Sequence, residues 1–332
     1  MRPSREIQLA SRPLGMPDPA DFALVEVSVP EPTDGEVLIR NAYISVDPYM
    51  RGRMNDAKSY VPPFVLGEVM TGGAVGRVVA SRNERFEEGA WVVHNLGWRE
   101  LALSDGMGLL PFDATAAPVS TGLGVLGMPG LTAYVGLLDV GRVEAGETLY
   151  VSGAAGAVGS AVGQIAKLKG CRVIGSAGSA EKVAWLKEIG FDEAFDYHDL
   201  PVREALGEGI DVYFDNVGGP TLEAALAALR LRGRIVACGA ISQYNATEPP
   251  AAPQNLFLIV TKRLRMEGFI ISDHFDRMPA FLAEVAPWVR DGSVRYRETV
   301  VDGIENAPDA FIGLLAGENT GKMLVRVGPD DA

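Results

Sequence analysis

The chain contains few of the residues that hold metal ions. Its 332 residues include only two cysteines, Cys171 and Cys238, and three histidines, His94, His198 and His274. A zinc site needs clustered cysteine and histidine, and no C-x-x-C or comparable paired spacing occurs. Each cysteine follows or ends a predicted apolar strand, where a free cysteine usually behaves as a small hydrophobic residue. We therefore expect no metal and interpret both cysteines as structural.

Basic runs and long apolar runs are also missing. The formal net charge is −13 and lysine and arginine are nowhere clustered, which argues against binding to nucleic acid or to an anionic membrane surface. No stretch approaches the roughly 20 apolar residues of a membrane span, and residues 1–14 lack the apolar segment of a secretion signal. The composition, 47% hydrophobic and 22% charged, is typical of a globular protein, and the length allows two domains. We expect a cytosolic protein whose partner is a small molecule.

The most informative segment that is present is a glycine-rich turn. Residues 151–159 read Val-Ser-Gly-Ala-Ala-Gly-Ala-Val-Gly. The residues before this turn, 148–151, are β-branched, apolar and aromatic, which favours a strand. The residues after it carry an apolar stripe of helical spacing that ends at Gly170, formed by Val158, Ala161, Val162, Ile165 and Leu168. The pattern predicts a strand, a turn and a helix in succession.

Three residues of this turn occupy the positions of the dinucleotide-binding fingerprint. Ala154, Gly156 and Gly159 lie at these positions, with alanine in place of the first glycine. Gly156 would let the backbone approach a pyrophosphate, and Gly159 would let the helix pack on its strand. The start of the helix would supply N–H groups and a partial positive charge. A glycine-rich turn by itself can have a purely structural role. The strand before this turn and the helix after it favour a dinucleotide site.

Two regions of different pattern follow from the rest of the chain. Between residues 146 and 270 predicted strands and helices alternate, which is typical of a doubly wound parallel sheet. The strands are expected at 172–174, near Phe195, at 212–214, at 234–238 and near Phe269, and the helices at 181–188 and 222–229. Residues 1–120 contain short apolar runs broken by proline and glycine, which favours a mostly β barrel or sandwich. The tail, 322–327, alternates like a strand and is expected to return to this first region.

The sequence after the fingerprint favours NADP over NAD. Proteins that bind NAD usually place an acidic residue about 20 residues after the fingerprint, where it bonds the ribose hydroxyls. No acidic residue occurs between Ser160 and Ala180. Lys182 lies in the first turn of the next predicted helix, where a lysine opposes the helix dipole unless an anion is bound. The alternative is that Lys182 is a solvated helix residue next to Glu181.

Several long segments resemble one family. They are 45–54 (SVDPYMRGRM), 67–70 (GEVM), 128–134 (MPGLTAY), 213–219 (YFDNVGG) and 238–245 (CGAISQYN). Together they are similar to the zinc-independent medium-chain dehydrogenases/reductases, in the branch of prostaglandin reductases, alkenal double-bond reductases and curcumin reductases. The resemblance runs nearly from end to end. The zinc-dependent relatives carry cysteine and histidine ligands in the catalytic domain, whereas this chain has no cysteine before Cys171.

The resemblance implies a fold, a cofactor and a reaction. The fold would combine a GroES-like, mostly β catalytic domain built from residues 1–122 and 300–332 with a Rossmann domain at 123–299. The reaction would be the NADPH-dependent reduction of the carbon-carbon double bond of α,β-unsaturated ketones and aldehydes. Family members are often homodimers joined at the edge of the Rossmann sheet. By family position, the residues that would bind the cofactor are Ala154, Gly156, Ala157, Val158, Gly159, Lys182, Tyr197, Asn216, Cys238, Gly239, Ala240, Ile241, Ser242, Phe269, Ile270, Ile271 and Asn319.

Reduction of an enone needs a hydrogen-bond donor rather than a strong base. Hydride added to the β-carbon leaves negative charge on the carbonyl oxygen, and the α-carbon is then protonated. Tyr244, in the loop after the 234–238 strand, is the candidate catalytic donor, with help from the cofactor ribose, and water is an alternative proton source. Tyr49 is assigned to the substrate pocket, although it could be an ordinary core aromatic. Arg51 and Arg53 are interpreted as structural.

Three other functions fit parts of the sequence. An NADPH-dependent quinone reductase would share the fold, the cofactor and the absence of zinc. A non-catalytic NADPH-binding protein would need the same glycine-rich turn. An alcohol dehydrogenase of the zinc type would share the fold but lacks its ligands here. The first two alternatives remain open from the sequence.

Overall fold

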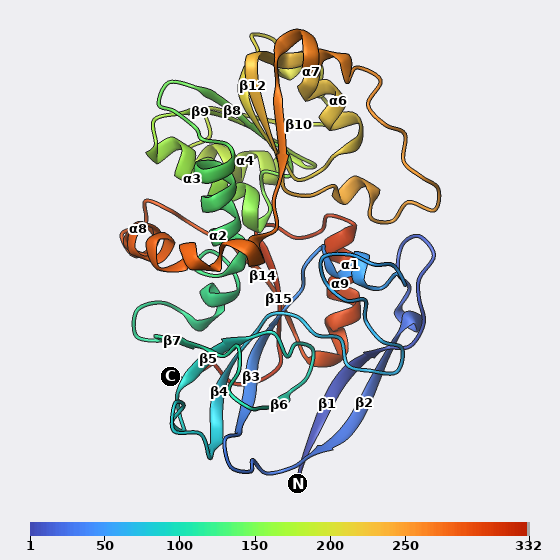
Figure 1. The fold of residues 1–332 in the computed structure, drawn as a ribbon, viewed down its shortest axis with the longest axis vertical. Helices are drawn as coiled ribbons and strands as arrows, with labels where there is room; N and C mark the ends of the chain where they lie inside the picture. Colours follow the sequence, from blue (N-terminus) through green and yellow to red (C-terminus); the bar gives the residue numbers. More distant parts are fainter. Residues whose placement is uncertain (331–332) are drawn as a thin grey trace. The chain divides into compact units, whose positions relative to one another are not determined.

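The computed structural model describes residues 1–330 and divides the chain into two compact units. The first unit joins Met1–Gly124 to the C-terminal segment that starts at Glu298, and the second unit is Val125–Arg297 (Figure 1). Each unit has its own sheet and its own core.

The second unit is built on a six-stranded parallel sheet. Its strands, in spatial order, are β10 (Glu193–Asp196), β9 (Arg172–Ala177), β8 (Thr148–Val151), β11 (Ile210–Asp215), β12 (Leu229–Ala237) and β13 (Arg265–Gly268). The chain runs outward from β8 to β10, then returns to the other side of β8 with β11. This reversal is a topological switch point, where ligands of open α/β sheets bind outside the carboxyl ends of the strands.

Helices cover both faces of this sheet. Alternate residues of β8 point to opposite faces, so that Leu149 and Val151 belong to one core and Tyr150 to the other. The first core includes residues of α2 (Met128–Val135), α3 (Ala157–Leu168), α4 (Ala180–Glu188) and α8 (Met278–Arg290). The second core includes residues of α5 (Val202–Ala205), α6 (Gly219–Ala228) and α7 (Phe257–Lys262). The unit is therefore a doubly wound, Rossmann-type fold.

The first unit contains a seven-stranded sheet that is mostly antiparallel. The order is β14 (Glu298–Asp302), β15 (Lys322–Arg326), β3 (Val37–Ser45), β4 (Ala74–Ser81), β5 (Trp91–His94) and β7 (Leu110–Phe112), and β6 (Leu101–Ser104) also pairs with β3. β1 (Arg2–Leu9) and β2 (Phe22–Val29) form a separate antiparallel pair. The helices of this unit are α1 (Met50–Arg53) and α9 (Ala307–Leu315).

The predicted fold class is confirmed, and the predicted bounds of α6 and β12 were wrong. The predicted tail strand is β15, which pairs with β3 and thus returns to the N-terminal region. The helix expected at 222–229 is α6, which begins earlier because Pro220 presets its first turn. Leu229 begins β12 instead of ending that helix, and Cys238 lies just beyond this strand. The strand expected near Phe269 is β13, which ends at Gly268.

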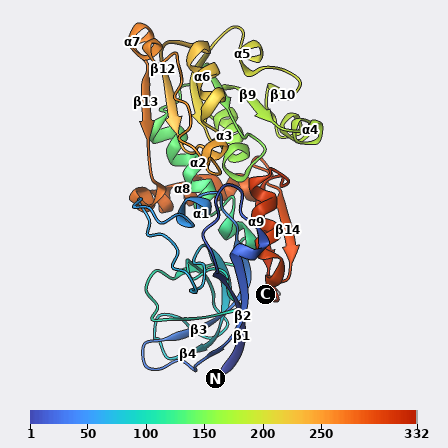
Figure 2. The same ribbon diagram turned by 90° about the vertical axis from the view of Figure 1, so that its right-hand side faces the viewer.

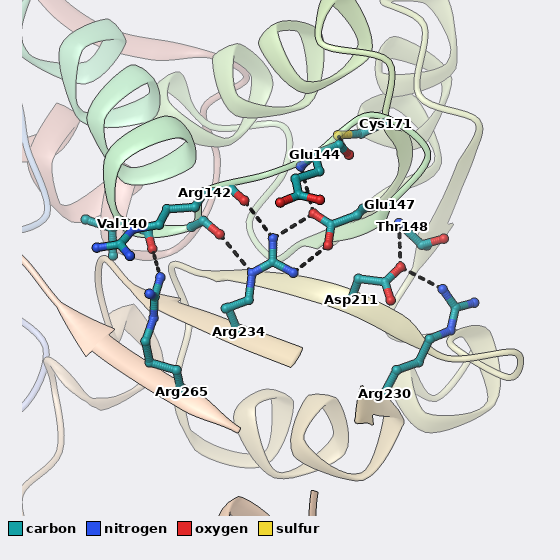
Figure 3. A network of polar contacts seen from close by, with 11 residues as sticks. Val140, Arg142, Glu144, Glu147, Thr148, Cys171, Asp211, Arg230, Arg234 and Arg265 are labelled. Carbon is teal, nitrogen blue, oxygen red and sulfur yellow. Dashed lines mark hydrogen bonds and ion pairs between the residues drawn. The ribbon is translucent and has the colours of Figure 1, made fainter. Parts of the chain in front are cut away.

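The amino ends of the central strands are tied together by a network of charged residues. Arg234 binds both carboxylate oxygens of Glu147, at 2.5 and 2.6 Å, and its Nε donates to the carbonyl of Gly141 at 3.0 Å (Figure 3). Asp211 accepts hydrogen bonds from the N–H of Thr148 at 2.9 Å and from Arg230 at 2.6 Å. These contacts lie at the edge opposite the strand ends that carry the candidate site, so we assign them a structural role.

Candidate cofactor and substrate site

The structure brings most of the predicted cofactor residues to one edge of the parallel sheet. Each of the six strands is followed at its carboxyl end by at least one of them. The residues that follow β8, β9, β10, β11, β12 and β13 are, respectively, the 152–159 turn, Lys182, Tyr197, Asn216, Cys238–Ser242 and Phe269–Ile271. This edge includes the switch point between β8 and β11.

The glycine-rich turn has little space for larger side chains. A Cβ on Gly159 would lie 2.5 Å from the carbonyl oxygen of Gly153 and 2.7 Å from Cα of Ala154, so α3 packs directly on the turn. Ala154 is fully buried, and its N–H donates to the carbonyl of Ser176 at 3.0 Å. Gly156 is the N-cap of α3 and has no side chain to bond the N–H groups of the first turn. These N–H groups, which include those of Ala157 and Val158, fit an anionic pyrophosphate.

Lys182 and Tyr197 lie where β9 and β10 end. Ser179 caps α4, and its hydroxyl accepts from the N–H of Lys182 at 3.3 Å, which fixes the lysine in the first turn of the helix. Burial lowers the pKa of the Lys182 ammonium. A Cβ on Gly178 would lie 2.6 Å from the phenol oxygen of Tyr197, so the phenol rests against the backbone just after β9. A cation thus follows β9 and a phenol follows the neighbouring β10.

Asp215 organises the carboxyl end of β11. Its Oδ1 accepts hydrogen bonds from the phenol of Tyr213 at 2.6 Å and from the N–H groups of Val217 at 2.9 Å and Gly218 at 2.8 Å. Burial raises the pKa of this carboxyl group, while these hydrogen bonds lower it. Asp215 is 3% exposed, so its role is to hold the loop and not to contact solvent.

Asn216 joins this loop to the glycine-rich turn. Its side-chain amide donates to the carbonyl of Ser152 at 2.8 Å, and its N–H donates to the hydroxyl of Ser152 at 3.1 Å. The ends of β8 and β11 are thereby bonded to each other at the switch point.

The loop after β12 is hydrogen-bonded to the end of β11 and to the loop that follows β11. The N–H groups of Cys238 and Gly239 donate to the carbonyl of Asp215 at 2.9 and 3.0 Å, and that of Ser242 donates to the carbonyl of Val217 at 3.2 Å. Burial raises the pKa of the Cys238 thiol to about 12. The thiol therefore stays protonated at neutral pH.

Tyr244 closes this loop. Its phenol oxygen accepts a hydrogen bond from the N–H of Ala240 at 3.2 Å, and a Cβ on Gly239 would lie 3.2 Å from the same oxygen. Burial raises the pKa of Tyr244, and the bond from Ala240 opposes this rise. Within residues 1–330 we find no acceptor for the phenol proton, so Tyr244 retains a donor for a ligand. Ile241 lies in the short helical turn between Ala240 and Tyr244.

Two side chains of the segment after β13 pack against the hydrophobic core of the second unit. These are Phe269 and Ile271, and a Cβ on Gly136 would lie 2.8 Å from the ring of Phe269. Ile270 is partly buried between them. Their side chains therefore shape the end of β13, and any polar contact from this segment comes from its backbone.

Tyr49 and Asn319 belong to the first unit. Tyr49 precedes α1, and its phenol lies near Arg53 and near Asp47. Burial and the charge of Asp47 raise the pKa of Tyr49, and Arg53 lowers it. Arg53 itself donates to the carbonyls of Pro62 and Thr71 at 3.0 and 2.9 Å, as expected of a structural residue. Asn319 is buried, and its amide donates to the carbonyl of Gly321 at 2.7 Å.

Two comparisons with protein-family models agree with the two units. Residues 5–112 match the model described as the N-terminal domain of oxidoreductase, and residues 157–286 match the model described as zinc-binding dehydrogenase.

Curated relatives cover almost the whole chain. The NADPH-dependent curcumin reductase of Escherichia coli is 48% identical, with 99% of this chain and 98% of the relative aligned. The 2-alkenal reductase (NADP(+)-dependent) of Nicotiana tabacum is 42% identical over 98% of this chain and 97% of its own. The crystal structure of CurA from Vibrio vulnificus in complex with NADPH has 49% identity and a TM-score of 0.93, covering 98% of this chain and 99% of that one. The chain belongs to the medium-chain dehydrogenase/reductase superfamily. Within it, it belongs to the branch of the curcumin, prostaglandin and alkenal reductases, as the sequence resemblance indicated.

The residues present do not fit the zinc site that one family model mentions. Within residues 1–330 no three histidine, cysteine, aspartate or glutamate side chains are grouped so that they could hold a metal ion. His94 is already bonded to Asn41 through Nε2 and to the N–H of Leu96 through Nδ1. The same part of the chain contains no helix with the length and apolar character needed to cross a membrane.

Two parts of the site were not found from the sequence. The first is the carboxylate of Asp215, which lies in the 213–219 segment but was given no role of its own, although an acidic residue at the end of an apolar strand is a recognisable signal. The second is a buried pair between Asp47 and Lys322, for which no local pattern exists.

Proposed function

We propose that the protein reduces the carbon-carbon double bond of α,β-unsaturated ketones and aldehydes, and that Tyr244 donates the hydrogen bond that stabilises the enolate. The observation that supports this most is the loop from Cys238 to Tyr244, which is bonded to the Asp215–Val217 loop beside the glycine-rich turn. Relatives named as NADPH-dependent curcumin reductase and 2-alkenal reductase support the reaction class.

Tyr244 is suited to act on a developing oxyanion. NADPH supplies the hydride that is added to the β-carbon, and the carbonyl oxygen then carries negative charge. The phenol oxygen of Tyr244 is held as an acceptor by the N–H of Ala240, so its proton is directed away from the loop. A donor held in place before the reaction lowers the barrier without reorganisation. Tyr244, or water that it orients, then protonates the α-carbon.

The cofactor-binding loops support NADPH over NADH. Lys182, in the first turn of α4, and Tyr197, against Gly178, would bind the 2′-phosphate. The first turn of α3 would bind the pyrophosphate through its N–H groups. Asn216, the loop from Cys238 to Ser242, the segment from Phe269 to Ile271 and Asn319 would contact the remainder of the dinucleotide.

Tyr49 is assigned to the substrate pocket. It is the partly buried phenol at the start of α1, next to Arg53. A guanidinium has only donors and cannot accept the phenol proton. The hydroxyl of Tyr49 would therefore donate a hydrogen bond to a polar group of the substrate.

A turnover assay with four substrate classes tests the proposal. The purified protein would be mixed with NADPH and with one substrate at a time: a 2-alkenal, an aryl enone, a quinone or a simple saturated ketone. The loss of reduced-nicotinamide absorbance would be followed in each mixture. We expect oxidation of NADPH with the alkenal and the enone, with product identified as the saturated carbonyl compound. Oxidation with the quinone alone would establish a quinone reductase, and tight NADPH binding without turnover would establish a non-catalytic protein.

The outer edge of the parallel sheet supports a homodimer. β13 is the last strand of the sheet, with no further strand on its outer side within the described residues (Figure 2). Met266 of β13 and Phe257 and Val260 of α7 are 43%, 71% and 65% exposed. An unpaired strand edge beside apolar side chains fits a second copy of the same chain. We expect light scattering to give a dimer mass, and Phe257→Lys with Val260→Lys to give a monomer.

A further inference from the structure

The first unit contains a buried ion pair that takes part in none of the chemistry described above. Nζ of Lys322 lies 3.1 Å from Oδ1 of Asp47, and both residues are 4% exposed. Nζ also donates to the carbonyls of Val46 at 2.8 Å and Met323 at 2.9 Å. The second carboxylate oxygen of Asp47 accepts from the hydroxyl of Ser45 at 2.5 Å. All three donors of the ammonium and both carboxylate oxygens are therefore engaged.

Such a pair is poorly explained by stability. Moving both charges out of water carries a desolvation penalty that can exceed the attraction between them, and apolar replacements are often neutral or stabilising. A buried pair with every donor and acceptor engaged does, however, fix the geometry of the backbone segments that it joins.

The pair joins the segment of Tyr49 to the segment of Asn319. β3 ends at Ser45, and the chain continues through Asp47 to Tyr49 at the start of α1. β15 begins at Lys322 and is preceded by Asn319, whose amide is bonded to the carbonyl of Gly321. Because β3 and β15 are antiparallel, with Leu324 opposite Ser45, the end of one and the start of the other lie at the same edge of the sheet.

We propose that the Lys322–Asp47 pair is a positioning device that sets the substrate-binding Tyr49 segment relative to the cofactor-binding Asn319 segment. This inference rests on the proposed function, because it takes Tyr49 as a substrate residue and Asn319 as a cofactor residue. Lys322 and Asp47 are both buried, and neither is assigned to bind substrate or cofactor. They act through the two backbone segments, and the negative charge of Asp47 also reaches the phenol of Tyr49.

The test replaces the pair by apolar residues and separates activity from stability. In Lys322→Met with Asp47→Leu, no buried charge is left without its partner. We would measure urea unfolding, the NADPH dissociation constant, and kcat and KM for a 2-alkenal. We expect a folded protein in which kcat/KM falls on the order of tenfold to a hundredfold, since small displacements of positioned groups are costly in rate. A folded double variant with wild-type kcat/KM would overturn the proposal.

An exposed ion pair at the other end of β15, where this strand pairs with β14, serves as the control. Arg326 of β15 binds Asp302 of β14 at 2.6 Å, and both side chains are exposed. Arg326→Met with Asp302→Leu should leave kcat/KM within about twofold of wild type, because surface pairs contribute little. An equal loss in the control would mean that any disturbance of β14 and β15 reduces activity, which also contradicts the proposal.

A double-mutant cycle with Tyr49→Phe distinguishes positioning from a general structural role. If the pair acts through Tyr49, the double variant loses less kcat/KM in the Tyr49→Phe background than in the wild-type background. Fully additive losses in both kcat/KM and NADPH affinity would contradict the proposal. If the double variant does not fold, Ser45→Ala decides, because it removes only the hydroxyl that orients Asp47. We expect a severalfold loss of kcat/KM with Ser45→Ala, and unchanged kinetics would overturn the proposal.

Measurements on the wild-type protein distinguish a failure of the positioning proposal from a failure of the proposed function. If it binds NADPH but reduces none of the unsaturated substrates, the proposed function fails. The positioning proposal is then decided by NADPH affinity alone, which must fall in Lys322→Met with Asp47→Leu and stay unchanged in the Arg326 and Asp302 control.

Discussion

The N–H of Ala240 donates a hydrogen bond of 3.2 Å to the phenol oxygen of Tyr244, four residues further along the chain. This bond uses a lone pair of the phenol oxygen and leaves the proton of the phenol free for a ligand. It also opposes the rise in pKa that burial causes. A loop that is itself bonded to the carbonyl of Asp215 thus presents a fixed donor at the sheet edge.

Replacing Tyr244 by phenylalanine should slow turnover without weakening cofactor binding. The change removes one donor to an oxyanion, which is worth about 2.7–4 kcal/mol, or on the order of 10²–10³ in kcat. Turnover of a good enone and NADPH affinity, from nicotinamide fluorescence, would be measured together. Unchanged kcat would remove Tyr244 from the mechanism, and a loss of NADPH affinity of the same size would make it a cofactor residue.

Replacing Lys182 by alanine should weaken NADPH binding more than NADH binding. A charge-assisted contact to the 2′-phosphate is worth ~1.5–3 kcal/mol, or roughly 10- to 150-fold in the dissociation constant. Lys187→Ala is the matched control, because this lysine lies in the last turn of the same helix and is exposed. Dissociation constants for both cofactors would be compared. Equal losses for NADPH and NADH, or an equal effect of Lys187→Ala, would exclude the phosphate contact.

The parts of the site that could be predicted from the sequence are those encoded within one short segment. The apolar strand, the glycine-rich turn and the apolar helix around Gly156 follow one another directly, so their pattern predicts the turn without knowledge of the rest of the chain. The alternation of strands and helices then places the residues after each strand at one edge. Tyr197 and Asn216 were found in this region through the family resemblance.

The parts that could not be predicted depend on partners far apart in the sequence. The carboxylate of Asp47 and the ammonium of Lys322 are separated by 275 residues, and neither flanking segment indicates the other. Ser152 and Asn216 are 64 residues apart and meet only because β8 and β11 are neighbours in the sheet. The boundary between α6 and β12 was misplaced for another reason: Leu229 fits the apolar patterns of both elements.

Replacing Asp215 by alanine should destabilise the second unit and weaken NADPH binding. The change removes the acceptor of the N–H groups of Val217 and Gly218, whereas the phenol of Tyr213, which also bonds Asp215, keeps the hydroxyl of Ser152 at 3.0 Å as an acceptor. Each buried N–H group that loses its acceptor costs about 1–3 kcal/mol, so the free energy of unfolding should fall by at least about 2 kcal/mol. Tyr213→Phe, which removes one of these bonds, should cost only about 1 kcal/mol. Equal losses in the two variants, measured by urea unfolding, would show that Asp215 does not organise the loop.

The buried histidine of the first unit should make stability depend on pH. Burial lowers the pKa of His94 to about 3, well below the value of about 6.5 in an unfolded chain. Between these values the unfolded state binds more protons, so stability is complete above pH 6.5 and is lost as the pH falls towards 3. From pH 7 to pH 5 the loss should be about 2 kcal/mol. His94→Gln, which keeps a donor for Asn41, should lack this contribution. Parallel stability curves for wild type and variant would contradict the assignment.

Two glycines of the same turn should respond differently to replacement by alanine. A Cβ on Gly159 would lie 2.5 Å from the backbone oxygen of Gly153, whereas a Cβ on Gly156 would lie 3.3 Å from the same atom. Gly159→Ala therefore forces α3 away from the turn, and we expect a loss of about 1–3 kcal/mol or more in the free energy of unfolding.

Gly156→Ala fits the folded backbone and should cost less than about 1 kcal/mol. Its methyl group, however, would stand at the N-terminus of α3, where the backbone must approach a pyrophosphate, so NADPH affinity should fall roughly tenfold or more. The two variants control for each other, because both exchange glycine for alanine within one turn. If Gly156→Ala binds NADPH as the wild type does, the pyrophosphate does not lie against this residue. If Gly159→Ala is as stable as the wild type, close packing of α3 on the turn is not what requires glycine there.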